Sequence, residues 1–446
     1  MKIAFVASEA FPFAKVGGLA DVVGSLPQAL KKLGMEPTIF LPWYSGIQGY
    51  YVGESYFGFE GRAEQVGLGH LEHGGVRYVL VGLPDFARER PYGYDDDFRR
   101  FVRFSLAAAE LVRDYDVVHA HDWQAALLPL LRNLGWFGGR TVYTIHNLAY
   151  QGVWGSQDFY AWTRLPGETY YGSGLEHNGV VNLMKCGIVN SDSVTTVSPS
   201  YADEIRSPYF GDGLDGVLRE QSYKLRGILN GLDTEYWNPA SDRYLPQHYT
   251  VQDLRPKAEI RAALLREFGL EDRLTLGVVS RFAHQKGIDL IADALQGILE
   301  RGLNLVLLGS GEPNLERTFS WIAAHQAGRV AYAQGYNEAL AHRIYAGCDG
   351  FLMPSRFEPC GLAQMISMRY GTPPIVRAVG GLKDTVRHWE TGFLFEYADA
   401  TGLLWGVEEF LKHPDRLGVA HNGMRTDFSW EAPAKEYAEL YRQISG

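Results

Sequence analysis

Short, apolar, β-rich runs alternate with longer amphipathic runs along almost the whole chain. Strands are predicted at 2–8, 37–41, 117–120, 140–145, 193–197 and 224–229, and again at 275–280, 303–308, 330–334, 350–353 and 374–376. Apolar strands separated by helices indicate parallel sheets that helices cover on both faces. Two such series predict an α/β protein with two doubly wound, Rossmann-like domains that face one cleft.

Helices are predicted between these strands, at 19–33, 97–114, 123–134, 178–190, 256–268, 286–301, 312–326, 337–346 and 361–370. The Gly-rich and aromatic segment 50–83 is predicted to be an inserted hairpin region. Pro steps and weak periodicity at 237–255 indicate a domain boundary. We therefore expect domains at 1–240 and 241–425, followed by a tail helix within 426–446.

Composition argues against several classes of protein. Lys and Arg number 42 and Asp and Glu 52, and a formal net charge of −10 does not suit a general nucleic-acid binder. The three cysteines have no paired spacing, which is typical of a reducing compartment and of neither a disulfide framework nor a thiolate metal site. The apolar start is too short for a signal peptide, and no run reaches the ~20 residues of a membrane span. We expect a cytoplasmic protein that binds no membrane, and its oligomeric state does not follow from sequence.

A glycine pair follows the first predicted strand, in Lys15-Val-Gly17-Gly18-Leu-Ala-Asp21. Glycine allows close approach of the backbone to a ligand, and the N-terminus of the next helix favours an anion. Lys15 adds a mobile cation. The alternative is a tight turn beside a surface lysine, and neither the nicotinamide fingerprint nor the P-loop pattern is present.

Two cations lie five residues apart after a strand of the second half, Arg281 and Lys286. Ligands of open α/β sheets bind at the carboxyl ends of strands. Arg can grip phosphate through two parallel hydrogen bonds, whereas Lys supplies a point charge. A solvated basic turn is the alternative. Gly380-Gly381-Leu382 enters a further helix and mirrors the first glycine pair.

A carboxylate lies between a strand and a predicted helix, in Arg356-Phe-Glu358-Pro-Cys360-Gly361-Leu362. The neighbouring Pro and Gly hold Glu358 rigidly near a helix start, where it could bond sugar hydroxyls. The alternative is a helix-capping acid.

Histidines end two strands of the first half, in His119-Ala-His121-Asp122 and at His146. Alternation places His119 and His121 on one face of their strand, as metal ligands can be. Packed or hydrogen-bonded histidines are the favoured interpretation, since no second ligand cluster has convincing spacing. We expect no metal site.

These motifs occur in one order and together resemble the bacterial glycogen synthase and plant starch synthase family, whose fold is called GT-B. Seven of them span residues 1 to about 390: Lys15-x-Gly-Gly-Leu-Ala-Asp-Val, His119-Ala-His-Asp-Trp, Ile145-His-Asn-Leu-Ala-Tyr-Gln-Gly, Asn230-Gly-x-Asp-x-x-x-Trp-Asn-Pro, Ser280-Arg-x-x-x-Gln-Lys-Gly, Arg356-Phe-Glu-Pro-Cys-Gly-Leu and Gly380-Gly-Leu-x-Asp-Thr. None is decisive alone, but seven in order are highly specific.

The resemblance implies retaining transfer of glucose from ADP-glucose to the non-reducing end of an α-1,4-glucan, without metal or cofactor. It implies that Arg281 and Lys286 hold the distal phosphate and that Tyr336 stacks on adenine. The implied catalytic set is Glu358, Arg281, Lys286, Asp122 and His146. The implied donor- or substrate-binding set is Lys15, Gly17, Gly18, Asp21, Asn230, Tyr336, Cys360, Gly361, Leu362, Gly380, Gly381 and Leu382. The tail helix is expected to cross back onto the first domain.

The chain departs from the family pattern where Val379 replaces a common Thr and where Ile366 replaces a common aromatic residue. Three other functions stay open. One is a GT-B transferase that uses UDP-glucose or a different acceptor. A second is a glucan-binding protein without catalysis, which 26 Tyr and 10 Trp would suit. A third is a His-x-His metal hydrolase.

Overall fold

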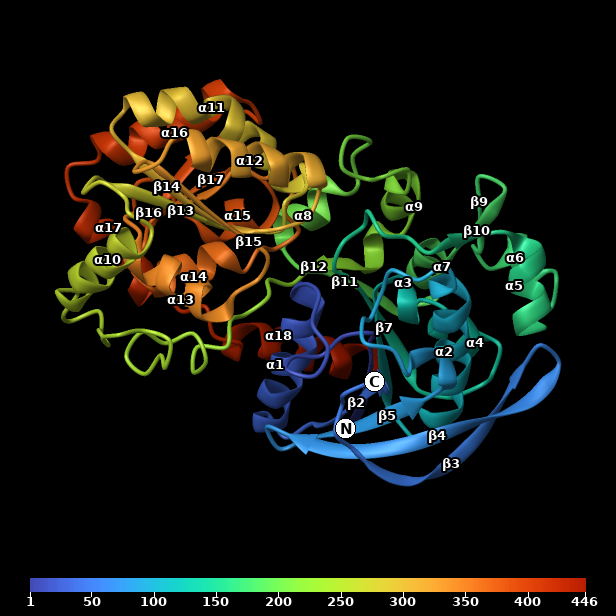
Figure 1. The fold of residues 1–446 in the computed structure, drawn as a ribbon. Helices are drawn as coiled ribbons and strands as arrows, with labels where there is room; N and C mark the ends of the chain where they lie inside the picture. Colours follow the sequence, from blue (N-terminus) through green and yellow to red (C-terminus); the bar gives the residue numbers. More distant parts are fainter. The chain divides into compact units, whose positions relative to one another are not determined.

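The computed structural model describes residues 1–446 and divides the chain into two compact units. Unit 1 comprises Met1–Gly231 and Trp430–Gly446, and unit 2 comprises Leu232–Ser429 (Figure 1). Each unit contains a large, mainly parallel sheet, which confirms the predicted α/β fold class. None of the helices has both the length and the apolar stretch needed to pass through a bilayer.

The large sheet of unit 1 has the strand order β12-β11-β7-β6-β1-β2-β5-β4-β3. Its parallel strands are β1 (Lys2–Val6), β2 (Glu36–Pro42), β5 (Val76–Gly82), β6 (Val117–His121), β7 (Arg140–Ile145), β11 (Ser193–Thr196) and β12 (Leu225–Gly227). β3 (Tyr50–Phe59) and β4 (Arg62–His73) continue the sheet in antiparallel fashion. A small separate sheet contains β8 (Val153–Trp154), β9 (Glu176–His177) and β10 (Val180–Asn182).

The helices of unit 1 connect these strands. They are α1 (Gly18–Lys32), α2 (Asp97–Leu111), α3 (Asp122–Ala125), α4 (Leu128–Asn133), α5 (Ser156–Thr163), α6 (Thr169–Gly172), α7 (Leu183–Asn190), α8 (Pro199–Glu204), α9 (Asp215–Glu220) and α18 (Glu431–Ser445). α18 packs against α1 (Figure 1). The hydroxyl of its Tyr441 lies 2.7 Å from Nδ1 of His119 in β6, so the last helix of the chain is tied to the central sheet of unit 1.

Three sequence predictions in unit 1 are wrong in detail. The segment 50–83 contains the predicted hairpin as β3–β4, but its last part, β5, is no insertion because it pairs in parallel with β2 inside the main sheet. The single helix at 123–134 is two short helices, since Pro129 fits only the first turn of α4 and has no N–H for the preceding turn. The helix at 178–190 begins only at Leu183, where the Asn182 side chain caps it by accepting a bond from the Lys185 N–H at 3.0 Å.

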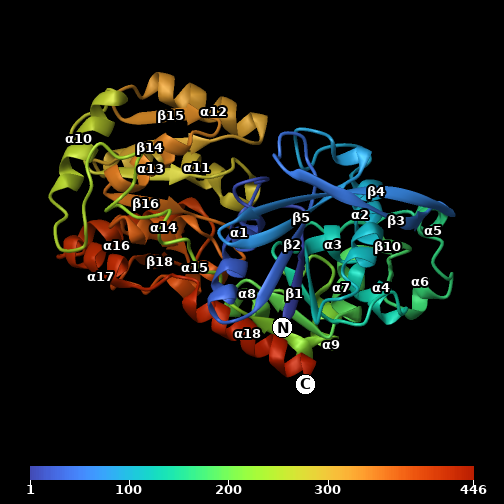
Figure 2. The same ribbon diagram turned by 90° about the horizontal axis from the view of Figure 1, so that it is seen from below.

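Unit 2 contains a six-stranded parallel sheet of order β15-β14-β13-β16-β17-β18. The strands are β13 (Thr275–Val279), β14 (Asn304–Gly309), β15 (Val330–Gln334), β16 (Gly350–Met353), β17 (Pro374–Arg377) and β18 (Phe393–Phe395). The helices are α10 (Pro256–Glu267), α11 (Ile288–Glu300), α12 (Pro313–His325), α13 (Glu338–Gly347), α14 (Ala363–Arg369), α15 (Gly380–Thr385), α16 (Ala400–Lys412) and α17 (Arg416–Arg425). α11 and α16 lie on one face of the sheet and α13 and α14 on the other (Figures 1 and 2).

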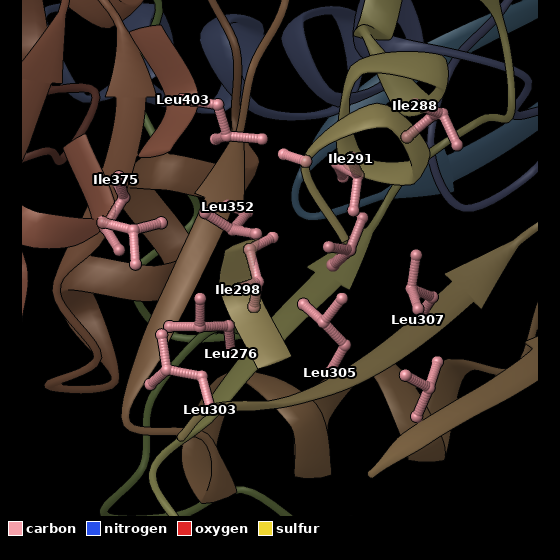
Figure 3. Packing of buried hydrophobic residues seen from close by; sticks show 14 of the residues in the cluster. Leu276, Ile288, Ile291, Ile298, Leu303, Leu305, Leu307, Leu352, Ile375 and Leu403 are labelled. Carbon is pink, nitrogen blue, oxygen red and sulfur yellow. The ribbon is translucent and has the colours of Figure 1, made fainter. Parts of the chain in front are cut away.

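The core of unit 2 forms where α11 meets the sheet. Leu276 and Leu305 of the strands are fully buried beside Ile291 and Ile298 of α11 (Figure 3). Burial of each such side chain contributes about 1.5–3 kcal/mol to the free energy of unfolding. This packing fixes the carboxyl ends of β13 and β16, from which the candidate functional loops leave.

Candidate active site

The first glycine loop joins β1 to α1 in unit 1. Gly17 is extended at φ −143° and ψ −165°, α1 begins at Gly18, and no side chain caps the helix. The Lys15 ammonium lies 2.8 Å from Oδ1 of Asp21, one turn into the helix. The loop therefore joins an uncapped helix N-terminus, which favours an anion, to a Lys15–Asp21 ion pair.

A buried carboxylate that the sequence analysis missed holds this loop. Glu9 is 4% exposed, and its Oε2 accepts bonds from the N–H groups of Val16 at 2.6 Å and Gly17 at 3.0 Å. The Tyr92 hydroxyl donates to its Oε1 at 2.7 Å. Burial raises the pKa of Glu9, although these three donors act in the opposite direction. Its place just after β1 is the signal that could have identified it.

The ends of β6 and β7 bring Asp122 and His146 together. Asp122 has φ 55°, a left-handed conformation that is uncommon outside glycine. Its Oδ1 accepts a bond from the His146 N–H at 2.7 Å. Burial raises the pKa of Asp122 to about 7 and lowers the pKa of His146 to about 3, so the histidine is neutral. His146 Nε2 lies 2.9 Å from Nδ1 of His121.

His119 and His121 do not form a chelating pair. Nδ1 of His119 lies 2.7 Å from the Tyr441 hydroxyl, and its Nε2 lies 2.6 Å from Oγ1 of Thr144. Both nitrogens of His119 are thus engaged inside the core. Its ring stacks on His121 with centroids 4.1 Å apart. His119 is thus a hydrogen-bonded core histidine, the favoured interpretation of the sequence, whereas Nε2 of the buried His121 has no hydrogen-bond partner.

Glu358 and Lys286 form an ion pair at the carboxyl edge of the unit 2 sheet. The Lys286 ammonium lies 2.8 and 2.9 Å from the two carboxylate oxygens, and Ser355 Oγ donates to Oε2 at 2.9 Å. Glu358 is 4% exposed. It lies five residues before α14, which begins at Ala363, so the helix-capping alternative is wrong. Arg281, in the loop after β13, is exposed.

Two glycine segments of unit 2 pack directly on the Glu358 loop. The Gly381 N–H donates to the Glu358 carbonyl at 3.0 Å, and a Cβ on Gly381 would lie 2.0 Å from the Cys360 carbonyl oxygen. Gly361 has φ 77°, which favours glycine. Val379 occupies the N-cap of α15 and provides no side-chain hydrogen bond. The start of α15 and residues 358–362 therefore form one closely packed turn.

Two further predicted residues lie elsewhere in their units. Tyr336, in unit 2, is 72% exposed and presents its ring to solvent. Asn230, in unit 1, is 6% exposed, and its amide oxygen has no hydrogen-bond partner. A buried acceptor without a partner is unusual in a folded protein and suits a residue that bonds a ligand.

An aromatic groove of about 580 Å³ in unit 1 was not predicted. Its lining residues are Tyr94, Asp95, Asp97, Phe98, Trp123, Ala149, Tyr150, Gln151, Gly152, Val153, Trp154 and Asp212. The Phe98 ring lies 6.1 Å from Trp123 and 5.6 Å from Trp154, at interplanar angles of 10° and 15°. Trp123, which lines the groove, directly follows Asp122 in the chain.

The fold and these residues define a glycosyltransferase with two Rossmann-like units. Residues 2–220 match the starch synthase catalytic domain model, and residues 261–427 match the model of glycosyl transferases group 1. The chain is 51% identical to a glycogen synthase of Thermus thermophilus and 45% identical to one of Deinococcus radiodurans, with all of each chain covered. The chain therefore belongs to the glycogen synthase and starch synthase family, as its motifs predicted.

Solved structures agree with this assignment. The catalytic domain of starch synthase IV from Arabidopsis thaliana, bound to ADP and acarbose, superposes with a TM-score of 0.93 at 35% identity, over 99% of both chains. A sucrose-phosphate synthase from Thermosynechococcus elongatus has a TM-score of 0.68 at 22% identity, over 99% of this chain and 98% of its own, and shows the shared fold alone. The predicted GT-B fold is confirmed.

Asp122→Asn should increase thermal stability more at pH 8 than at pH 5. The folded-state pKa of about 7 lies above the ordinary value of 3.8, so wild-type stability falls as pH rises through this window. The amide does not ionise and removes that loss. Thermal melts at both pH values measure the effect, with the exposed Asp114→Asn as control. An equal change in Tm at both pH values would contradict the inference that the Asp122 carboxyl group ionises in this pH range.

Proposed function

We propose that the enzyme transfers glucose from ADP-glucose to the non-reducing end of an α-1,4-glucan and retains the anomeric configuration. The observation that carries the proposal is the buried Glu358 carboxylate on the Lys286 ammonium, in a chain similar to glycogen synthases over its full length. The ADP held by the Arabidopsis neighbour supports an adenine nucleotide as the donor's leaving group.

We assign the donor to unit 2. Negative charge grows on the leaving diphosphate as the bond to the anomeric carbon breaks, and Arg281 and Lys286 stabilise it. The Gly380–Leu382 turn adds backbone N–H groups, and the exposed Tyr336 ring stacks on adenine. Glu358 orients the sugar hydroxyls and favours the positive charge that develops on the ring. Arg281 and Lys286 supply the positive charge that a metal ion would otherwise supply, so we expect that transfer requires no metal.

We assign the acceptor to unit 1. The partly exposed rings of Trp123 and Trp154 offer flat apolar faces to glucose units, and the buried Phe98 ring packs against both. Asp95 and Asp212 accept bonds from sugar hydroxyls. Asp122, His146 and Asn230 contact the reacting sugar where the groove ends. Lys15 and Asp21, with the Gly17–Gly18 turn, act on a charged part of the substrate during transfer.

Retention without a side-chain nucleophile implies attack from the face that the diphosphate leaves. The acceptor's hydroxyl oxygen forms the new bond to the anomeric carbon while the bond to the phosphate oxygen breaks. The hydroxyl proton passes to that phosphate oxygen, so that ADP is the other product. Neutral His146 can donate a hydrogen bond to the glucose and does not compete with Arg281 and Lys286 for the phosphates.

A cytoplasmic location is part of the proposal. Cys186, Cys348 and Cys360 are buried and form no disulfide, as proteins of a reducing compartment permit. Burial raises the pKa of the Cys186 and Cys348 thiols to about 12, so neither is a reactive thiolate.

Radiolabelled glucose should pass from ADP-glucose to glycogen in the presence of a chelator, and far more slowly from UDP-glucose. Label incorporated into precipitated glycogen measures both rates. A preference for UDP-glucose would show that ADP-glucose is not the natural donor. A rate that only added metal restores would overturn the assignment of Arg281 and Lys286 as the groups that stabilise the diphosphate. Binding of glycogen without transfer from either donor would favour a non-enzymatic glucan-binding protein.

Glu358→Gln should lower kcat by about 10²–10³-fold, because the amide cannot favour positive charge on the sugar ring. The Kd for ADP should change by less than about threefold, since Arg281 and Lys286 remain. Steady-state assays and calorimetric titration with ADP separate the two effects. The exposed Glu300→Gln is the matched control, and a wild-type kcat for Glu358→Gln would show that this carboxylate has a different role.

Trp154→Ala should raise KM for maltooligosaccharide acceptors about tenfold, because one stacking surface of the groove is lost. KM for ADP-glucose should stay unchanged. Initial rates with each substrate varied in turn provide both constants. Trp321→Ala, which removes an indole on α12 of unit 2, is the control. A rise in KM for ADP-glucose alone would show that the groove does not bind the acceptor.

A further inference from the structure

Two exposed indoles of unit 2, Trp389 and Trp405, are not among the residues assigned to the transfer reaction. Trp389 lies between α15 and β18 and is 39% exposed, and Trp405 lies on α16 and is 48% exposed. The ring of His388 lies between them, stacked on Trp405 with centroids 5.8 Å apart and 6.5 Å from Trp389. The ring of His413 lies 4.7 Å from Trp389. We call these four rings the outer aromatic row.

The backbone at Trp389 is held in an unfavourable conformation. Its φ is 68°, in the left-handed region that bulky side chains rarely adopt. The indole is nevertheless 39% exposed, so a considerable part of this large apolar side chain faces solvent. Strain of this kind persists where the surrounding structure imposes it and is found at ligand sites.

Polar groups fix the indole in place. Trp389 Nε1 donates to Oε2 of Glu409 at 2.7 Å, and the His413 Nε2–H donates to the Trp389 carbonyl at 3.0 Å. His388 Nδ1 accepts from the Leu394 N–H at 3.0 Å, so its proton lies on Nε2, 3.7 Å from the same Glu409 oxygen. Trp405 and Glu409 are one helical turn apart on α16 and share a face.

We propose that the outer aromatic row is a second, non-catalytic site that binds an α-1,4-glucan. Apolar ring faces beside carboxylate and imidazole groups match a glucose unit, which presents C–H faces and a rim of hydroxyls. Arg387, Glu390 and Lys412 lie close in sequence to the row. The cores of protein interfaces are depleted of charged residues, so these neighbours argue against a protein as the ligand. The identity of the ligand rests on the proposed function. The site would hold a polymer near the enzyme while its chain ends react.

The test uses the full chain with Trp389→Asn and Trp405→Ala combined. Asn tolerates the left-handed conformation, and Ala suits an exposed helix position, so the fold should be retained. Electrophoresis in gels that contain glycogen measures binding without any reaction. Affinity for glycogen should fall about fivefold or more, with a similar rise in the glycogen KM. The kcat and KM with maltotriose and ADP-glucose should stay unchanged, since so short an acceptor cannot use both sites.

Trp321→Ala is a matched control. Trp321 is 62% exposed and stacks on His325 at 4.0 Å, but it lies on α12 without a second indole. This variant should migrate in glycogen gels as the wild type does. Trp405→Ala alone, measured with thermal melts, decides the outcome if the double variant unfolds.

Two results separate this inference from the proposed function. Unchanged retardation of the double variant, in an enzyme that transfers glucose from ADP-glucose, would overturn the second site and leave the function standing. Loss of retardation in a chain that transfers from no donor would support the site and overturn the function. A parallel loss of activity on maltotriose would show that the row belongs to the catalytic machinery and is not a separate site.

Discussion

Parallel strands end at one edge of their sheet, and this constraint places every functional loop of the protein. In unit 1 the loops that follow β1, β6 and β7 carry Lys15, Asp122 and His146 to the same edge. In unit 2 the loops after β13, β16 and β17 do the same for Lys286, Glu358 and Gly381. Residues far apart in sequence therefore become neighbours without any long connection.

The cost of burying charge decides how these loops are built. Glu9, Asp122 and Glu358 all lie at strand ends within their units, where desolvation disfavours a carboxylate. Backbone N–H groups offset part of that cost for Glu9 and Asp122, whose pKa values stay raised, and the Lys286 ammonium pairs with Glu358. Removal of one partner would leave a buried charge unpaired, which destabilises a protein strongly. The carboxylates are thus held before any substrate arrives.

Close backbone packing explains why glycine recurs beside them. Gly381 allows the start of α15 to contact the Cys360 carbonyl, and Gly361 supplies the left-handed turn before α14. A larger side chain at either position would push the Glu358 loop away from Lys286. The same reasoning limits the effect of Val379, which changes a hydrogen bond at the helix start and not the packing of the turn.

The sequence alone determined the α/β alternation, most strand positions and the motifs around Lys15, Asp122, Lys286 and Glu358. These features are local: a strand, a turn and the first turn of a helix depend on nearby residues. It misjudged 123–134 and 178–190, where Pro129 and Asn182 divide an apolar run that has helical spacing.

Only the tertiary structure decided which distant side chains meet. Glu9 holds the Lys15 loop together with Tyr92, and the aromatic groove joins rings from three segments around Phe98, Trp123 and Trp154. The outer aromatic row likewise depends on α16 packing against the end of the sheet. The periodicity of the sequence does not predict such contacts. They form when apolar surface is buried between elements that are far apart along the chain.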